Sequence, residues 1–453
     1  MRSGAAEVAD PQRTRRPWQA LLARGVYVVL SYALAPFALG FLAWRGLWNH
    51  AYWERFGERL GFAKVRFATP SIWIHAVSVG EVQAAAPLVR ALLAEYPQTP
   101  VVVSTTTPTG AQRVQALFHG NVAHVYAPYD TPGGMRRFFA RIRPRLVVII
   151  ETELWPNLFH ECGRRRVPLV LASARISPRS LGSYRRFTAL FREALSHGIV
   201  IAAQSEADAE RFRDLGASPE RTHVTGNIKF DFETPAQVRD RVAAFRTPWA
   251  AGRPVWVAAS THSGEDEQVL DALEETRRAH PDCLLLIAPR HPERFTAVAA
   301  LVRGRGLALA TRSSGEPCGA AKQVFLLDTL GELPSFYAAA AVAFVGGSLV
   351  PIGGHNLLEP AALGVPIITG PYNFNAEEVA DMLVASGGAR RLRDGGELGP
   401  AVIELLDDPA LREQRGQTAQ RFVQDNRGAL ERLLALVRPL LDAGRSAGAA
   451  SAS

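Results

Sequence analysis

The stretch SIWIHAVSVGEVQAAAPLVRALLAE, residues 71–95, decides the fold class. Its first seven residues form an apolar run typical of a buried strand, and SVGE then leads into a helical pattern over 83–95. Further strand-like runs follow at 100–105, 123–128, 146–151, 168–174 and 199–205. Helical patterns lie between these runs, so the βαβα order predicts a parallel sheet with helices on both faces.

The same alternation restarts after a polar interval at 231–253 that contains Pro235 and Pro248. Strand-like runs recur at 254–260, 283–289, 323–328, 342–348 and 365–370, and residues 406–441 have a helical pattern. The order predicts an α/β protein with two Rossmann-like domains facing a cleft, at 46–235 and 236–442, followed by a flexible tail at 443–453. In such sheets ligands bind beyond the carboxyl ends of the strands.

The N-terminal residues predict a membrane-anchor helix. A polar, basic arm at 1–20 precedes it, and the anchor is placed at 21–45. Residues 25–44 carry no charge, and at about 1.5 Å per residue they are long enough to cross the hydrocarbon of a bilayer. Two alternatives stay open. One is a cleaved signal peptide, and the other is a re-entrant or interface-lying helix broken at Pro36.

Composition narrows the class of protein and of partner. Apolar residues make up 47% and charged residues 21% of 453 residues, which is typical of a folded globular chain. The formal net charge of 51 − 43 = +8 favours phosphates, nucleic acid or anionic lipid as partners. The three cysteines form no CxxC pair and no Cys/His cluster, so we expect no disulfide framework, no structural zinc and a reducing compartment.

Three carboxylates follow predicted strands in the first half. Glu81 falls in the first helical turn after strand 71–77, where the helix dipole would keep it ionised. An ionised carboxylate there can act as a general base toward a hydroxyl, although a helix-stabilising glutamate occupies the same position. Glu151 and Glu153 lie at the end of the run 146–151 and just beyond it, suited to hold a hydroxyl, a cation or an arginine.

Basic residues are the other candidates in the first half. Arg175 begins a loop with two arginines and two serines over 174–180, which suits phosphate or carboxylate recognition or an ion pair with a nearby glutamate. Lys229 is one of only three lysines beside 51 − 3 = 48 arginines, which suggests that a compact point charge is needed there. His75, on a buried strand, is interpreted as a core histidine.

The glycine-rich segment 346–356 is the strongest local signal in the second half. Its paired glycines would let the backbone approach a ligand, and the helix expected at 357–363 would offer free N–H groups to an anion. Ser348, Gly354 and His355 are candidate donor-site residues in this segment. The chain has neither GxGxxG nor GxxxxGK[ST], which disfavours classical dinucleotide and P-loop sites.

Seven motifs, taken in order, resemble the 3-deoxy-D-manno-octulosonic acid (Kdo) transferases of lipopolysaccharide assembly. They are WERFGERLGF (53–62), HAVSVGE (75–81), ETELWPN (151–157), ASARIS (172–177), GNIKFD (226–231), APRHPERF (288–295) and GGSLVPIGGHNLLEPAALGVPIITGP (346–371). The resemblance covers roughly residues 20–430.

This resemblance implies a GT-B glycosyltransferase that transfers Kdo from CMP-Kdo to lipid IVA with inversion, with no metal and no cofactor. It implies that Glu81 is the general base and that Glu151 and Lys229 stabilise the transition state. Glu153 and Arg175 become candidates for acceptor binding or support. The implied contacts with CMP are Pro289, Arg290, Leu330, Gly331, Glu332, Asn356, Leu357, Leu358 and Glu359.

The expected partners are CMP-Kdo, lipid IVA and membrane lipid, and no nucleic acid. We expect an inner-membrane location, by a single-pass or monotopic anchor, with the catalytic domains in the cytoplasm. Two alternatives remain: another GT-B transferase or a related sugar-nucleotide epimerase, and a non-catalytic membrane-bound binder of lipid or nucleotide.

Overall fold

The computed structural model describes residues 17–176, 190, 194–195, 198–232, 252–316 and 318–449. Some predictions lie outside these ranges: the arm up to residue 16, the loop 177–180, the interior of the linker with the predicted boundary at 235, and the last tail residues. Within them the chain forms two compact units. Unit 1 comprises Met1–Asp231 with Gly428–Ser453, and unit 2 comprises Phe232–Arg427.

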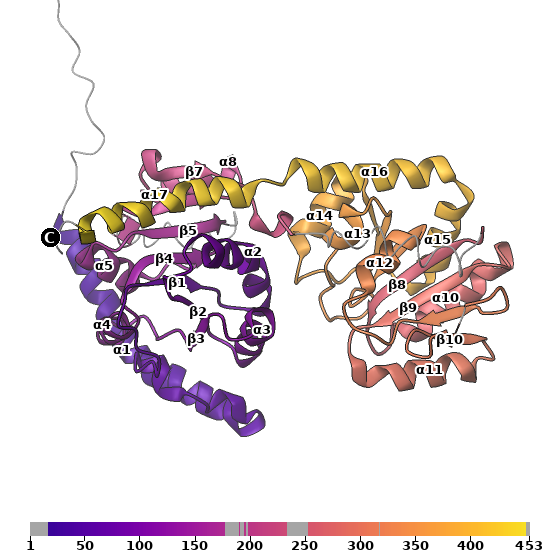
Figure 1. The fold of residues 1–453 in the computed structure, drawn as a ribbon, viewed down its shortest axis with the longest axis horizontal. Coiled ribbons are helices and arrows are strands. Elements are labelled where there is room, and N and C mark those ends of the chain that lie inside the picture. Colours follow the sequence, from indigo (N-terminus) through magenta and orange to yellow (C-terminus); the bar gives the residue numbers. More distant parts are fainter. Residues whose placement is uncertain are drawn as a thin grey trace, which may run out of the picture. The chain divides into compact units, whose positions relative to one another are not determined.

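Unit 1 is built on a seven-stranded parallel sheet (Figure 1). Its strand order is β3-β2-β1-β4-β5-β6-β7, in which the winding reverses between β1 and β4. Side chains alternate between the two faces, and each face carries its own apolar cluster, which explains why the strands read as unbroken apolar runs. The strands are β1 Ser71–His75, β2 Val101–Thr105, β3 Ala123–Tyr126, β4 Pro144–Ile150, β5 Leu169–Ala174, β6 Val200–Ala203 and β7 Thr222–Val224.

Helices cover both faces of this sheet, and most begin at a side-chain cap. Ser78 caps α2, Thr107 caps α3 and Thr131 caps α4, each accepting a backbone N–H of the first turn. The helices are α1 Pro17–Trp48, α2 Val79–Glu95, α3 Pro108–Phe118, α4 Pro132–Ile142, α5 Pro156–Arg165, α8 Glu206–Asp214 and α17 Ala429–Ala449. The 3₁₀ helices are η2 His50–Tyr52, η3 Phe56–Leu60, η4 Pro219–Arg221 and η5 Ile228–Phe230.

The C-terminal helix departs from the predicted domain boundary. The sequence placed residues up to 442 in the second domain, but α17, yellow in Figure 1, belongs to unit 1. Its apolar side chains, from Ala429 to Leu441, complete one of the two clusters of the first sheet. The expected helix at 406–441 is interrupted between α16 and α17. Gly428 lies in this interruption, and its φ of +86° is a backbone conformation that a regular helix does not contain.

Unit 2 repeats the parallel architecture, with strand order β10-β11-β9-β8-β12-β13-β14. The winding reverses between β8 and β12, and apolar clusters again lie on both faces. The strands are β8 Val255–Thr261, β9 Leu284–Pro289, β10 Leu309–Thr311, β11 Val324–Leu326, β12 Val342–Val345, β13 Ile367–Thr369 and β14 Ala389–Arg391. The helices are α10 Asp266–Ala279, α11 Phe295–Gly304, α12 Leu333–Ala339, α13 Leu358–Ala362, α14 Glu377–Ala385, α15 Leu398–Asp407 and α16 Pro409–Asp425, with 3₁₀ helices η6 Pro292–Arg294 and η7 Gly395–Glu397.

The predicted fold class of two parallel α/β sheets is confirmed. Each of the eleven apolar runs identified in the sequence overlaps a strand. The three strands that were not predicted, β7, β10 and β14, are three residues long and are only partly buried. Helix α1 contains a segment, Leu21–Trp48, that is long and apolar enough to cross a membrane and is only 6% buried.

Candidate functional site

The candidate site of unit 1 lies where the strand order reverses, at the carboxyl ends of β1 and β4. Glu81 follows β1, in the first turn of α2, and Glu151 directly follows β4. The Glu81 carboxylate accepts the backbone N–H of Val77 and the Ser78 hydroxyl (3.3 Å), while Ser78 Oγ accepts the Glu81 N–H (3.4 Å). This reciprocal cap fixes the side chain at the crevice where parallel α/β sheets bind ligands.

The acidity of Glu81 differs from the expectation. The helix dipole was expected to keep the carboxylate ionised, but burial raises the pKa of Glu81 to about 7. The pKa of about 7 includes the negative charges of Glu151 and Glu153, which also raise it, and the hydrogen bonds from Val77 and Ser78, which lower it. A carboxylate with a pKa near 7 is better suited to accept a proton at neutral pH than an ordinary glutamate.

Glu151 and Lys229 form an ion pair beside Glu81. Lys229 Nζ lies 2.5 Å from Glu151 Oε1, and both side chains stay partly exposed, at 33% and 25%. The backbone of Glu151 adopts a φ of +61°, a left-handed conformation that is uncommon for residues other than glycine. Backbone strain of this kind clusters at functional sites. Together, the ion pair and the positions after β1 and β4 bring Glu81, Glu151 and Lys229 to one edge of the sheet.

Lys229 is held in place by the C-terminal helix. It lies in η5, where Asn227 Oδ1 accepts its N–H at 3.0 Å. Two residues later the Asp231 carboxylate accepts the N–H groups of Gly428 and Leu430, both at 2.6 Å, at the start of α17. The short helix η5, which carries Lys229, is thus bonded through Asp231 to α17, which begins about 200 residues further along the chain.

Glu153 and Arg175 surround this group. Trp155 Nε1 donates to Glu153 Oε2 at 2.6 Å, and burial raises the pKa of Glu153. The backbone N–H of Arg175 donates to Thr152 Oγ1 at 3.0 Å, which ties the start of the serine- and arginine-containing loop to the segment after β4. The Arg175 side chain is exposed.

His75 is a core histidine, as interpreted from the sequence. Its ring is fully buried, with Nδ1 2.8 Å from Ser104 Oγ, and burial lowers its pKa to about 4. Trp73 Nε1 donates to the same Ser104 Oγ at 2.7 Å. The ring also lies 4.8 Å from that of Trp155, so His75 supports the segment that carries Glu153.

The candidate site of unit 2 lies at the corresponding reversal, after β8 and β12. Glu265 is fully buried here, and its carboxylate accepts four backbone N–H groups: those of His262, Gly347, Ser348 and Leu349, at 2.7–2.9 Å. One carboxylate therefore joins the turn after β8 to the glycine-rich loop after β12. Glu265 was not predicted from the sequence, where a glutamate just before a helix has no distinctive signal.

The paired glycines pack against the protein itself, which differs from the expected approach to a ligand. A side-chain carbon at Gly346 would lie 2.9 Å from backbone atoms of Ser260 and Thr261, and one at Gly347 would meet the His355 ring at 2.9 Å. A side-chain carbon at Gly354 would likewise lie 2.6 Å from Asn373 Oδ1. Ser348 is buried, and its hydroxyl donates to Val345 O and accepts from Gly370 N–H.

His355 pairs with His262, a residue that was not predicted as part of the site. The two Nε2 atoms are 2.8 Å apart, the ring centroids 5.0 Å, and the ring planes differ by 9°. These values describe rings lying edge to edge in one plane, so one Nε2–H donates to the other nitrogen. Burial and the positive charge of Arg290 lower the pKa of His355 to about 4, which keeps the pair neutral at pH 7.

The remaining predicted CMP contacts fall on neighbouring loops of unit 2. Pro289 ends β9, and the exposed Arg290 donates its backbone N–H to Thr261 O at 3.0 Å. Asn356 Nδ2 donates to Glu359 Oε1 at 3.1 Å, and Asn356 Oδ1 accepts the Leu358 N–H. The expected helix at 357–363 is only five residues long, so its dipole offers little to an anion.

Leu330, Gly331 and Glu332 form the turn before α12. Leu330 is 71% exposed and Gly331 has a φ of +84°. Glu332 forms a bidentate ion pair with Arg312, at 2.9–3.3 Å. This turn follows β11, so it also lies beyond the carboxyl end of a strand.

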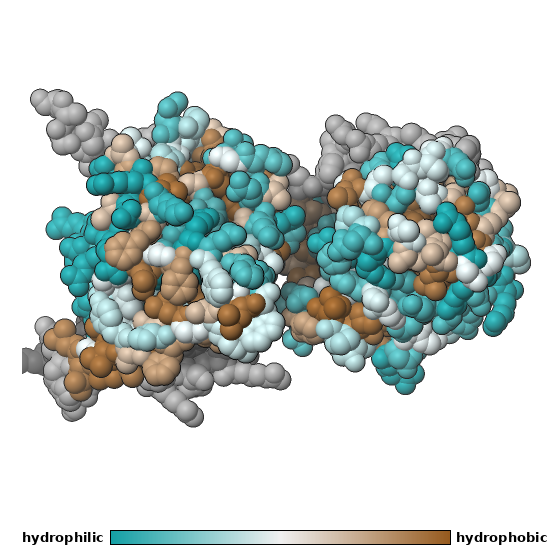
Figure 2. Space-filling model, turned by 90° about the horizontal axis from the view of Figure 1, so that it is seen from below, coloured by the Kyte–Doolittle hydropathy of each residue, from teal (hydrophilic) through white to brown (hydrophobic). Residues whose placement is uncertain are grey.

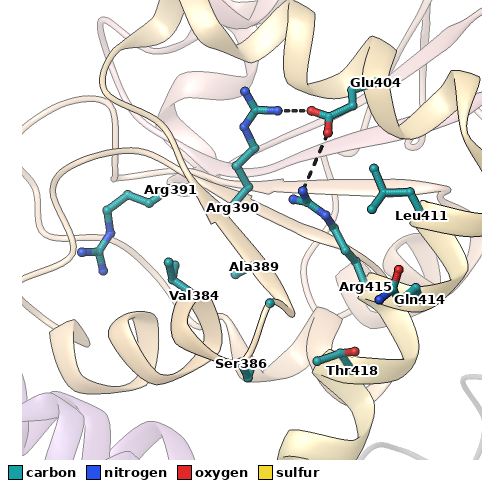
Figure 3. Close-up of a pocket in the computed structure, with 11 residues that line it drawn as sticks. Val384, Ser386, Ala389, Arg390, Arg391, Glu404, Leu411, Gln414, Arg415 and Thr418 are labelled. Carbon is teal, nitrogen blue, oxygen red and sulfur yellow. Dashed lines mark hydrogen bonds and ion pairs between the residues drawn. The ribbon is translucent and has the colours of Figure 1, made fainter.

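A shallow pocket of about 730 Å³ lies elsewhere in unit 2, at β14, α15 and α16 (Figure 3). Figure 3 shows Glu404 between Arg390 and Arg415, with which it forms ion pairs. None of the predicted site residues lines this pocket. Over the residues that the structure describes, no three His, Cys, Asp or Glu side chains are placed to hold a metal ion.

Comparisons with known proteins identify relatives of the whole chain. A family model described as "3-Deoxy-D-manno-octulosonic-acid transferase (kdotransferase)" matches residues 54–232. The 3-deoxy-D-manno-octulosonic acid transferase of Haemophilus influenzae is 41% identical over 422 residues, covering 92% of this chain and 99% of that protein. The enzyme of the same name from Bordetella pertussis is 40% identical over 433 residues, covering 91% and 98%.

Solved structures show the same two-unit fold. The UDP-GlcNAc 2-epimerase of Neisseria meningitidis, bound to UDP-GlcNAc, superposes with a TM-score of 0.53 at 14% identity, covering 82% of this chain and 100% of that one. At this identity the likeness concerns the fold alone. A C-terminal CMP-Kdo binding domain from Acinetobacter baumannii is 34% identical and covers 41% of this chain and 98% of that domain, with a TM-score of 0.40.

Proposed function

This chain belongs to the Kdo transferase family, and on that premise we propose that it transfers Kdo from CMP-Kdo to lipid IVA with inversion at the anomeric carbon. Membership makes it a glycosyltransferase, and its two Rossmann-like units have the GT-B architecture. The identities of donor and acceptor, the stereochemical course and the residue roles are the content of the proposal.

The grouping of Glu81, Glu151 and Lys229 at one strand crossover carries the proposal. In the proposed reaction the Glu81 carboxylate takes the proton of an acceptor hydroxyl. The resulting oxygen forms a bond to the anomeric carbon of Kdo, and the bond from that carbon to the CMP phosphate breaks. The phosphate of CMP keeps the electron pair. A single displacement of this kind needs one base, and the raised pKa of Glu81 places it in the useful range.

Lys229 and Glu151 act electrostatically in this proposal. The donor carries a carboxylate and a phosphate, and the Lys229 ammonium offsets this negative charge as it develops on the leaving group. Glu151 keeps the ammonium in position through the 2.5 Å ion pair. Glu151 also repels the negative charge of ionised Glu81, which strengthens Glu81 as a base.

We propose that unit 2 binds the CMP moiety through the loops after its strands. Arg290 is exposed beside His355 and Glu359, whose pKa values both respond to its charge. Glu265 fixes the glycine-rich loop by three backbone hydrogen bonds and the turn after β8 by a fourth, so the polar groups of this loop are ordered before a ligand arrives.

Donor use and product stereochemistry test the proposal. The purified full-length protein would be incubated with lipid IVA and either CMP-Kdo or UDP-GlcNAc, with product mass and anomeric configuration as readouts. We expect a Kdo adduct of inverted configuration with CMP-Kdo only. Retention of configuration would refute the single displacement. Turnover of UDP-GlcNAc without CMP-Kdo use would refute the donor assignment.

A further inference from the structure

Helix α1 contacts the rest of unit 1 along one stripe, from Tyr27 to Gly46. The more buried positions recur every three or four residues, at Tyr27, Ser31, Ala35, Ala38, Leu42 and Gly46. Nineteen residues separate the first from the last, which is a length of about 28 Å in a helix. The contact stripe is therefore as long as the hydrocarbon layer that a spanning helix would have to cross.

Hydrogen bonds hold this stripe against the globular unit. Tyr27 donates its hydroxyl to Asp130 Oδ2 at 2.8 Å. Further along, Tyr32 accepts the backbone N–H of Gly133 at 3.0 Å, and Tyr129 donates to Ala38 O at 3.3 Å. The same Asp130 carboxylate accepts the N–H groups of Asn157 and Leu158 at the start of α5, so the first contact is part of the core of unit 1.

The end of the helix is fixed by Trp53. Its indole N–H donates to Ala43 O at 2.9 Å, and its ring lies so close to Gly46 that a side-chain carbon there would meet the indole at 1.8 Å. The chain turns back on the helix at this point and then leads into η3 and β1. Contacts therefore fix α1 from Tyr27 to Gly46.

The opposite face of α1 is apolar and exposed. In the described part of the chain, eleven of the twenty large exposed apolar side chains lie on this helix without taking part in these hydrogen bonds: Leu21, Leu22, Val26, Val29, Leu30, Leu34, Phe37, Phe41, Trp44, Leu47 and Trp48. Figure 2 shows brown, apolar side chains gathered at the lower left margin of unit 1, beside teal and pale surface. A patch of this size on a soluble surface indicates an interaction site.

Arginine–aromatic pairs border this apolar face. The Arg137 guanidinium lies over the Phe62 ring at 4.7 Å and close to Tyr32, and Phe62 is 48% exposed. The Arg45 guanidinium lies over the Tyr52 ring at 4.6 Å. Such pairs suit the headgroup layer of an anionic membrane, where the ring meets the acyl boundary and the cation meets phosphate.

We propose that α1 lies in the plane of one leaflet, as a monotopic helix, with its exposed face in the acyl layer and its contact stripe on unit 1. If α1 spanned the bilayer, the groups of unit 1 that contact it, among them the Asp130 carboxylate and the Gly133 backbone, would have to lie in the hydrocarbon layer, where irregular backbone and polar groups do not face lipid. Both ends of α1 then lie on the side of the membrane that holds the rest of unit 1. The occupant of this surface is a bilayer with anionic headgroups.

Labelling of single cysteines tests this topology. The native cysteines Cys162, Cys283 and Cys318 are buried, so the unmodified full-length protein serves as the blank. Ser3→Cys reports the side before α1, and Glu210→Cys reports an exposed position on α8. Sealed inside-out and right-side-out inner-membrane vesicles would each be treated with an impermeant maleimide. We expect both variants to react in the same vesicle type. Reaction of Ser3→Cys only in the opposite type would overturn the proposal.

The membrane-facing assignment is tested with Phe37, which is 76% exposed on α1. Phe37→Asp should lower partition onto phosphatidylethanolamine–phosphatidylglycerol vesicles at least tenfold, because a charge enters the acyl layer. Met382→Asp, at an exposed apolar position of unit 2, is the matched control and should leave partition unchanged. Equal partition of Phe37→Asp and wild type would refute the assignment. Neither experiment measures sugar transfer, so their outcome is independent of the proposed function.

Discussion

Glu81 has a pKa of about 7, so the rate of Kdo transfer should depend on pH across the neutral range. The base must be ionised, and activity is therefore lost as the pH falls through this pKa. About half of Glu81 is ionised at pH 7 and about a tenth at pH 6, which predicts a fall in kcat/KM of about tenfold between pH 8 and pH 6. Initial rates with CMP-Kdo and lipid IVA, at five or six pH values from 5.5 to 8.5, give this profile.

Glu153→Gln separates the ionisation of Glu81 from that of the substrates. The negative charge of Glu153 contributes to the raised pKa of Glu81, and glutamine keeps an oxygen that can accept the Trp155 N–H. Removal of this charge should move the acid limb to lower pH by about half a unit. An ionising phosphate of the lipid would keep its own pKa in this variant.

Glu210→Gln is the matched control, because Glu210 is exposed on α8. Its profile should overlay that of the wild type. A kcat/KM that stays constant from pH 5.5 to 8.5 would refute Glu81 as the base. An acid limb that stays in place in Glu153→Gln would refute the electrostatic origin of its pKa.

Three other changes test the supports of the site. Lys229→Met should lower kcat about 100-fold, because the ammonium that offsets the negative charge of the leaving group is lost. The Tm should change little, because a partly exposed ion pair adds little stability. An unchanged kcat in steady-state assays would refute the electrostatic role of Lys229. Asp231→Ala should destabilise unit 1 by about 1–2 kcal/mol in urea unfolding and should also lower kcat. The control Asp425→Ala, at an exposed position, should change neither quantity. Loss of stability with an unchanged kcat would show that the Asp231 cap of α17 does not position Lys229. Glu265→Gln should weaken CMP binding at least tenfold in calorimetry, because a single amide oxygen cannot accept four N–H groups. An unchanged affinity would show that the glycine-rich loop keeps its conformation without this carboxylate.

The sequence predicted the sheets because buried parallel strands have a purely local signature. The runs at 71–77 and 146–151, for example, are apolar on both faces, as the structure confirms for β1 and β4. Strands β7, β10 and β14 have no such signature, since each has three residues and their pairing depends on neighbouring strands. The place of α17 could not be predicted locally either, because the cluster that it completes forms with residues more than 200 positions earlier.

The sequence could predict that Glu81 and Glu151 lie near each other, but it could not predict the acidity of Glu81 or the role of Glu265. Glu81 and Glu151 follow strands that are neighbours in the sheet, so their side chains could be expected at one edge. The raised pKa of Glu81 arises from burial and from the two glutamates around it, which only the folded structure shows. Glu265 has the sequence context of an ordinary helix start, and three of its four hydrogen bonds are to a loop at least 82 residues away.

The most direct test of the account is product formation by wild type and Glu81→Gln, side by side. Each purified full-length protein would be given CMP-Kdo and lipid IVA, with the Kdo adduct followed by mass spectrometry and CMP binding followed by calorimetry. The account predicts that wild type forms the adduct and that Glu81→Gln forms it at least 100-fold more slowly with unchanged CMP affinity. Equal rates of adduct formation in the two proteins would contradict it.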